Sequence, residues 1–254
     1  MRLSLVLFFA FTSAAAAEDI AAKLDWNPVL DSRQLIAIRG VHYAPQFALR
    51  DWSIRRATNG GSDVTRFEVR PGDQWSEDAS SGENKERSEL DGYKNSWRSG
   101  TDVWGGYSFF IEPGLRYRSD WNCIGQMHSA GIDVKPISIH FKDERLLINS
   151  EASNGARPTV TLRYNGPLSR KEWHHVVFHI NQNAAGNGRL EFWLDGNKIV
   201  NYSGPIGSYA NYYWKFGIYR GYGPIEAPFA IQYANMEIGT TDLSGRVGNP
   251  LAIR

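Results

Sequence analysis

Short runs of alternating apolar and polar residues, each bounded by turn residues, recur along most of the chain. Alternation with a period of two gives a strand one apolar and one polar face, whereas a helix needs an apolar residue at every third or fourth position. The pattern therefore predicts an all-β protein. The candidate strands are 65–70, 105–112, 121–128, 136–142, 159–164, 174–180, 189–194, 214–219 and 229–238.

The number and spacing of these runs favour one two-layered domain. A chain of 254 residues with 42% hydrophobic and 13% aromatic content can fill a large core. No Pro-rich or Gly/Ser-rich linker divides it, so we expect a single domain at 18–254, folded as a two-sheet β-sandwich or jelly roll. Asp195-Gly196 predicts a tight hairpin turn, and 76–86 predicts a loop over a site or an exposed excursion.

The first seventeen residues have the pattern of a secretory signal peptide. Arg2 is followed by an apolar stretch, and small residues lead up to Ala17, after which we expect cleavage. No later segment is apolar for long enough to span a membrane. We therefore expect an exported protein, periplasmic or secreted, and we separately expect it to be a monomer.

The charge and cysteine content restrict the possible partners. With 28 basic and 27 acidic residues the formal net charge is +1, so no global field attracts nucleic acid or an anionic membrane. A lone cysteine, Cys123, cannot form an intramolecular disulfide, and we interpret it as a small buried apolar residue.

Strand parity separates an apolar face from a polar face in several of the runs. In the run around 214–219, one face carries Trp214, Phe216 and Ile218, and the other carries Tyr213, Lys215 and Tyr219. In 121–128 the predicted polar face carries Asn122, Ile124, Gln126 and His128. Arg66 and Arg70 lie on either side of Glu68 at alternate positions, and Arg87 lies two residues before Glu89. His140 shares a predicted strand face with Ser138 and Lys142.

These polar faces have two interpretations. Each alone is also expected of an ordinary solvated strand. Together they supply guanidinium, amide, imidazole, ammonium and phenol groups, which are the groups needed to hold an anionic polymer and to transfer protons.

Four segments with this inventory resemble the jelly-roll polysaccharide lyases. They are the segments 66–73, 87–90, 126–128 and 213–219, which contain Arg-Phe-Glu-Val-Arg-Pro-Gly-Asp, Arg-Ser-Glu-Leu, Gln-Met-His and Tyr-Trp-Lys-Phe-Gly-Ile-Tyr. The similarity is to the group of heparin lyase I and glucuronan lyase, and more loosely to alginate lyases of the same fold. Its order and spacing extend over about 66–238, and it implies a concanavalin-like β-sandwich or jelly roll with a concave substrate cleft.

The resemblance implies β-elimination beside a uronic acid, with a 4,5-unsaturated sugar as product. It implies that Arg87 and Gln126 neutralise the uronate carboxylate and that Lys215 stabilises charge. His128 is base or neutraliser and Tyr219 is acid or acid/base; which of the two is the base is left open. Further substrate contacts are expected from Arg66, Arg70, Asn122, His140 and Tyr213.

The substrate expected from this resemblance is an anionic, uronic-acid-containing polysaccharide such as glucuronan. No cofactor is expected to be required; calcium is possible, but the sequence assigns no ligands to it. Two alternatives stay open at this point. A non-catalytic glycan-binding module could use Trp104, Trp193 and Tyr222, and a glycoside hydrolase would need two closely placed carboxylates.

Overall fold

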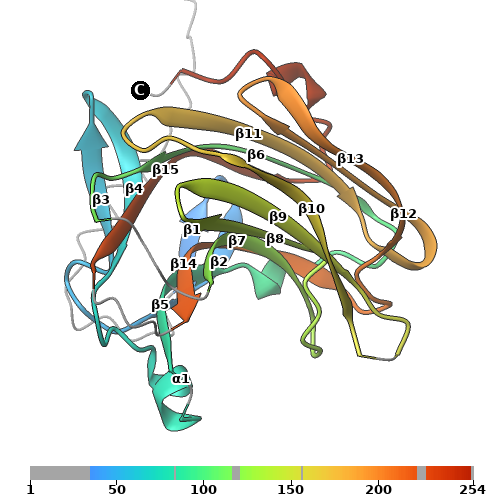
Figure 1. Ribbon diagram of the computed structural model, residues 1–254, viewed down its shortest axis with the longest axis horizontal. Coiled ribbons are helices and arrows are strands. Elements are labelled where there is room, and N and C mark those ends of the chain that lie inside the picture. The colour runs from blue at the N-terminus through green and yellow to red at the C-terminus, as the bar shows by residue number, and fades with distance from the viewer. Residues whose placement is uncertain (1–34, 83, 116–120, 156, 222–226, 253–254) are drawn as a thin grey trace, which may run out of the picture.

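The computed structural model describes residues 35–82, 84–115, 121–155, 157–221 and 227–252, and it consists mainly of antiparallel strands in two stacked sheets (Figure 1). The predicted all-β sandwich is confirmed. The predicted signal peptide, 1–17, lies outside the described residues. Within the described residues, no helix has the length and apolar character needed to cross a membrane.

The first sheet has eight strands in the order β1-β2-β5-β14-β7-β8-β9-β10, and each neighbouring pair is antiparallel. Its strands are β1 (Ile36–Ile38), β2 (Val41–Phe47), β5 (Lys85–Asp91), β7 (Asn122–Ser129), β8 (Ile137–Lys142), β9 (Arg145–Ala152), β10 (Thr159–Pro167) and β14 (Tyr212–Gly221).

The second sheet has seven strands in the order β13-β12-β11-β6-β15-β4-β3. Its strands are β3 (Ile54–Asn59), β4 (Ser62–Val69), β6 (Asp102–Ile111), β11 (Trp173–Asn181), β12 (Asn183–Leu194), β13 (Asn197–Ile206) and β15 (Phe229–Gly239). Figure 1 shows both sheets bent in the same direction, with the eight-stranded sheet on the inner, concave side.

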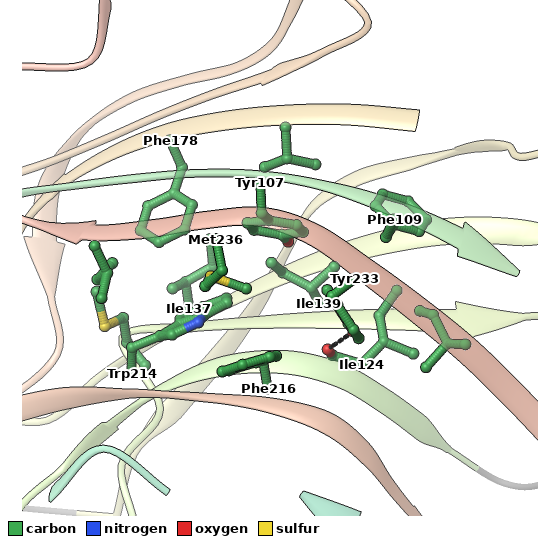
Figure 2. Packing of buried hydrophobic residues seen from close by; sticks show 14 of the residues in the cluster. Tyr107, Phe109, Ile124, Ile137, Ile139, Phe178, Trp214, Phe216, Tyr233 and Met236 are labelled. Atoms are coloured by element: carbon green, nitrogen blue, oxygen red, sulfur yellow. Dashed lines mark hydrogen bonds between the residues drawn. The ribbon is translucent and has the colours of Figure 1, made fainter. Parts of the chain in front are cut away.

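The apolar faces of the two sheets meet in one core. Trp214 and Phe216 of β14 project toward Tyr107 of β6 and Phe178 of β11 (Figure 2). The ring centres of Phe178 and Trp214 are 5.0 Å apart. Each such side chain contributes about 1.5–3 kcal/mol when it is fully buried. The apolar parity predicted for the β14 run is thus confirmed, and the opposite face of β14 is left for polar residues.

Each of the nine predicted runs corresponds to a strand, with ends shifted by up to six residues. The hairpin at Asp195-Gly196 is confirmed, since it joins β12 to β13 with both residues at positive φ, 50° and 80°. A two-residue turn of this kind requires positive φ at both positions, which asparagine, aspartate and glycine tolerate best.

The segment 76–86, predicted as a loop over a site or an exposed excursion, is not simply a loop. It contains a short helix, α1 (Ser76–Ser80), and the first two residues of β5. Asp78 of α1 is buried and accepts two hydrogen bonds from Arg87, so the segment is anchored to the eight-stranded sheet. Its polarity reflects a buried ion pair as well as solvent exposure.

A bulge in β7 changes the predicted faces of that strand. Relative to β8, Ile124 is an extra residue, because Cys123 pairs with His140 and Gly125 pairs with Ile139. Ile124 lies in the core, and its carbonyl accepts a hydrogen bond from Tyr233 (Figure 2). One extra residue reverses every face on its N-terminal side.

Candidate active site

Two pairs of predicted site residues lie side by side on the face of the eight-stranded sheet that points away from the core. Lys215 of β14 is opposite Gln126 of β7, and Tyr213 is opposite His128. Directly opposed residues of an antiparallel pair project from the same face. The structure therefore brings together residues that are about ninety positions apart in the sequence.

A buried carboxylate, Glu89 of β5, joins Lys215 to Gln126. Its side chain is 2% exposed, Oε2 lies 3.0 Å from Lys215 Nζ, and Oε1 accepts a 2.7 Å hydrogen bond from Gln126 Nε2. Burial opposes its ionisation, but the charges of Lys215 and Arg87 and the bond from Gln126 outweigh burial and hold the pKa of Glu89 below its usual value. Glu89 is a fixed anion that orients both partners.

The ammonium of Lys215 is fully engaged by protein groups. Its side chain is 6% exposed, and Nζ lies 3.0 Å from Glu89, 2.9 Å from Gln46 Oε1 and 3.4 Å from Asp91 Oδ2. An ammonium has three N–H groups, so each one has an acceptor. Lys215 is thus a fixed positive charge beneath the concave face.

Gln46 of β2 connects the two cations of the site. Its Oε1 accepts hydrogen bonds from Lys215 Nζ and from Arg87 Nη1, at 2.9 and 2.8 Å, while its Nε2 donates to Asp91 Oδ2 at 3.0 Å. These three bonds fix the orientation of the amide. Gln46 was not predicted for the site, because a single glutamine beside Pro45 on an N-terminal strand has no distinguishing pattern.

Arg87 is held by Asp78. Its Nε and Nη2 each donate a 2.8 Å hydrogen bond to that carboxylate, and Nη1 also lies 3.3 Å from Glu89. Burial alone would lower the pKa of Arg87. Glu89, Tyr219 and Asp78 outweigh this effect and keep the pKa above its usual value. Three buried carboxylates, Asp78, Glu89 and Asp91, thus surround two cations, Arg87 and Lys215.

The phenol of Tyr219 lies over Arg87. The guanidinium carbon is 3.8 Å from the centre of the Tyr219 ring, and the edge of Trp121 packs against the same ring at 4.6 Å and 68°. Because the guanidinium also reaches Glu89, the Tyr219 ring borders the centre formed by Glu89, Gln126 and Lys215. Trp121 was not predicted for this face, since the bulge at Ile124 moves it there.

The hydrogen bonding of His128 defines its tautomer. Nδ1 lies 2.9 Å from the backbone oxygen of Ser129, and a carbonyl oxygen only accepts, so Nδ1 carries the proton. In the neutral ring the lone pair is therefore on Nε2, which lies 3.5 Å from Oδ1 of the exposed Asp133. Burial lowers the pKa of His128, and the charge of Lys215 lowers it further. Tyr213 Oη lies 3.5 Å from Nδ1, and burial, followed by Asp91, raises the pKa of that phenol.

His140 and Cys123 extend the same face across β7 and β8. Cys123 is opposite both Tyr219 and His140, and the Nε2 atom of His140 lies 2.9 Å from the hydroxyl of Ser138. Burial lowers the pKa of His140 to about 4 and raises that of Cys123 to about 12. Cys123 is buried as predicted, although it belongs to the polar side of the sheet.

The predicted positions of Arg66 and Arg70 beside the site are wrong. Arg66 lies on β4 of the seven-stranded sheet, where it pairs with Glu68 at 2.5 Å and with Glu112 at 2.6 Å. Arg70 follows β4 and pairs with Glu68 at 2.6 Å. Alternation identifies the polar face of a strand but not the sheet to which that strand belongs.

The predicted position of Asn122 on the site face is also wrong. Asn122 is completely buried, is opposite Arg220, and donates from Nδ2 to the backbone oxygen of Phe141. The bulge at Ile124 turns it away from the face that carries Tyr219. Sequence alternation across 122–128 could not register that extra residue.

Among the residues that the structure describes, no group of three or more His, Cys, Asp or Glu side chains is arranged to hold a metal ion.

Comparison with known families decides the class of protein. Residues 42–241 match the family model described as polysaccharide lyase. The chain belongs to the polysaccharide lyase family. It is therefore an enzyme of that family, and its substrate is a polysaccharide. No functionally curated protein matches its sequence.

Solved polysaccharide lyases share the fold at low sequence identity. The endo-β-1,4-glucuronan lyase of the fungus Trichoderma reesei aligns with a TM-score of 0.61 and 15% identity over 76% of this chain and 88% of that chain. The family 7 alginate lyase A1-II′ aligns with a TM-score of 0.56 and 12% identity, over 76% and 84%. A marine family 7 alginate lyase from Zobellia galactanivorans gives 0.50 and 14%, over 76% and 82%.

Proposed function

We propose that this lyase is an exported monomer that cleaves a uronic-acid-containing polysaccharide, glucuronan or a related polymer, by β-elimination. Family membership supports lyase chemistry, and the similar solved enzymes are named for glucuronan and alginate, both of which are uronate polymers. The signal-like residues 1–17 support export.

The observation that carries the proposal is the state of His128 on the concave face. Its pKa is lowered, so the ring is neutral near pH 7, and its hydrogen bond to Ser129 leaves the lone pair on Nε2. A general base must be unprotonated and must direct its lone pair at the proton. His128 fits this role, and Tyr219, supported by Arg87, fits the role of the acid.

In the proposed step the C5–H bond of the uronate breaks and its proton goes to His128 Nε2. The electron pair forms the C4–C5 double bond as the C4–O4 bond breaks, and the leaving oxygen takes the proton of Tyr219. Proton exchange with water then restores both side chains. The product carries a 4,5-unsaturated uronate at its new non-reducing end.

Stabilisation of the carboxylate falls mainly to Gln126 in this scheme. One N–H of its amide is held by Glu89, which leaves the second N–H for the substrate. A donor aimed at developing negative charge contributes about 3 kcal/mol in comparable sites. Arg87 and Lys215 contribute fixed positive charge near Gln126 and do not bind the carboxylate directly, since protein groups already occupy most of their N–H groups.

The two alternative functions are less well supported. The predicted sugar platforms Trp104 and Trp193 stand 6.1 Å apart and nearly parallel, and Trp104 also stacks on His179. The His179 ring thus covers one face of Trp104. Tyr222 lies outside the described residues. A hydrolase would need two available carboxylates, whereas Glu89 and Asp91 are buried and paired with Lys215.

The proposal is tested by mixing the mature protein with glucuronan, alginate, heparin, hyaluronan and pectate, with neutral cellulose as control. Elimination creates a conjugated double bond whose ultraviolet absorbance is followed with time. We expect a rise with glucuronan or another uronate polymer and none with cellulose. If the ultraviolet absorbance rises with none of the five uronate polymers, the proposal is overturned.

A further inference from the structure

An exposed aromatic ring stands next to the candidate base. Tyr93 begins the short 3-10 helix η1 (Tyr93–Asn95), directly after β5, and is 48% exposed. Its ring centre is 6.3 Å from that of Tyr213, which is 5.7 Å from that of His128. Three rings thus form a continuous path from solvent to His128, and each step is comparable to the length of one sugar ring.

The turn that presents Tyr93 is rigidly attached to the site. The backbone N–H of Tyr93 donates to Asp91 Oδ1 at 2.8 Å, and that of Gly92 donates to the Trp214 oxygen at 3.0 Å. A Cβ on Gly92 would lie 2.7 Å from the same oxygen, so the close approach requires glycine. Asp91 also binds Gln46 and lies near Lys215, so the turn is tied to the buried charges.

A cation accompanies the exposed ring. Lys94 Nζ lies 4.6 Å from the centre of the Tyr93 ring. No carboxylate lies within ion-pairing distance of Lys94 among the residues that the structure describes. The two cations under the concave face are neutralised by carboxylates, whereas Lys94 has no carboxylate partner among the described residues. The ammonium lies over one face of the Tyr93 ring, and the combination of an aromatic ring and an ammonium matches the C–H groups and the carboxylate of a uronic acid.

We propose that Tyr93 and Lys94 form a binding subsite for a uronic acid unit that neighbours the unit cleaved at His128. The inference rests on the proposed function for its class of polymer. Such a subsite touches no reacting atom and binds substrate and transition state equally. Its loss therefore raises KM and leaves kcat unchanged.

The test compares four variants on long glucuronan and on its shortest cleavable oligosaccharide. Tyr93→Ala is expected to raise KM for the long chain about five- to tenfold, a loss typical of one aromatic contact, while Tyr93→Phe keeps KM within about twofold of wild type. Lys94→Met is expected to raise KM about threefold at low salt and to lose that effect at high salt. Lys171→Met, an exposed lysine beside β11, is the charge-matched control and leaves KM unchanged.

The outcomes separate this inference from the proposed function. If wild type eliminates glucuronan and Tyr93→Ala has an unaltered KM, the subsite is wrong and the lyase proposal stands. If wild type shows no elimination, binding of glucuronan to wild type, Tyr93→Ala and Lys94→Met is measured by calorimetry. Weaker binding by both variants supports the subsite, and equal binding, or no binding by wild type, overturns it.

Discussion

The guanidinium carbon of Arg87 lies 3.8 Å from the ring centre of Tyr219, and its Nε and Nη2 are bound to Asp78. Sequence resemblance implied that Arg87 contacts the uronate carboxylate. The geometry instead supports a positioning role, in which Arg87 fixes the phenol and places positive charge beneath it. Asp78, from a helix that was not predicted, thereby becomes a structural requirement of the site.

Removing Asp78 should be costly to stability. Asp78→Ala leaves the buried guanidinium of Arg87 without its bidentate partner, and we expect the free energy of unfolding to fall by about 3–5 kcal/mol. Chemical denaturation measures the loss. The control is Asp63→Ala, which breaks the partly exposed pair with Arg56 and should cost less than about 1 kcal/mol. Equal losses in the two variants would contradict a buried ion pair at Arg87.

The proton-transfer residues are distinguished by three variants. His128→Ala and Tyr219→Phe should each lower kcat by about 10²–10⁴-fold, because each removes a proton-transfer group. Tyr213→Phe should lower it by only about tenfold or less, since its hydroxyl lies beside Nδ1, the nitrogen that is not the base. Circular dichroism checks that each variant is folded. A larger loss in Tyr213→Phe than in Tyr219→Phe would make Tyr213 the acid.

Gln46 provides a test of the link between the two cations. Gln46→Ala removes the oxygen that accepts from Arg87 and Lys215, and we expect kcat to fall about tenfold with little change in KM. Gln46→Glu places a second carboxylate next to Asp91, and two close carboxylates share a proton. The pH profile of this variant should show an additional ionisation, and an unchanged profile would argue against the link.

Activity should persist below the usual pKa of histidine. Burial and Lys215 lower the pKa of His128 from 6.5, so the ring stays neutral, and able to accept a proton, in mildly acidic solution. The acid limb of kcat/KM should therefore lie below pH 6.5, and an NMR titration of His128 should give the same midpoint. An acid limb above pH 6.5 would show that burial and Lys215 do not govern this ring.

Stability should decrease in acid through His140. Its pKa is about 4 in the folded protein and about 6.5 when unfolded, so the unfolded chain binds more protons between these values. The contribution is complete above pH 6.5 and is lost as pH falls toward 4. His140→Gln should therefore reduce the slope of unfolding free energy against pH in this range, and an unaltered slope would contradict the buried neutral ring.

Local sequence patterns predicted nine of the fifteen strands of the described residues and part of the site. The parity of β14 placed Tyr213, Lys215 and Tyr219 on one face, because every second residue of that strand is apolar and buried. The pairs that complete the site, Lys215 with Gln126 and Tyr213 with His128, follow from strand order. The polar faces of the strands suggested that these residues act together, and resemblance to known lyases suggested the role of each.

The errors have two physical origins. Arg66 and Arg70 were placed in the cleft because alternation does not identify the sheet that a strand joins. Asn122 was placed there because a single extra residue, Ile124, reverses the faces on its N-terminal side. Gln46 and Asp78 were missed because their roles depend on contacts across 41 and 9 positions of the sequence, which carry no local pattern.

The central claim is that the chain breaks its polymer by elimination at a uronate. The most direct measurement counts, in one digestion of glucuronan, the new unsaturated ends by ultraviolet absorbance and the new reducing ends by a chemical assay. β-Elimination predicts one unsaturated end for every reducing end in wild type and neither in His128→Ala. Reducing ends without unsaturated ends would contradict the account and indicate hydrolysis.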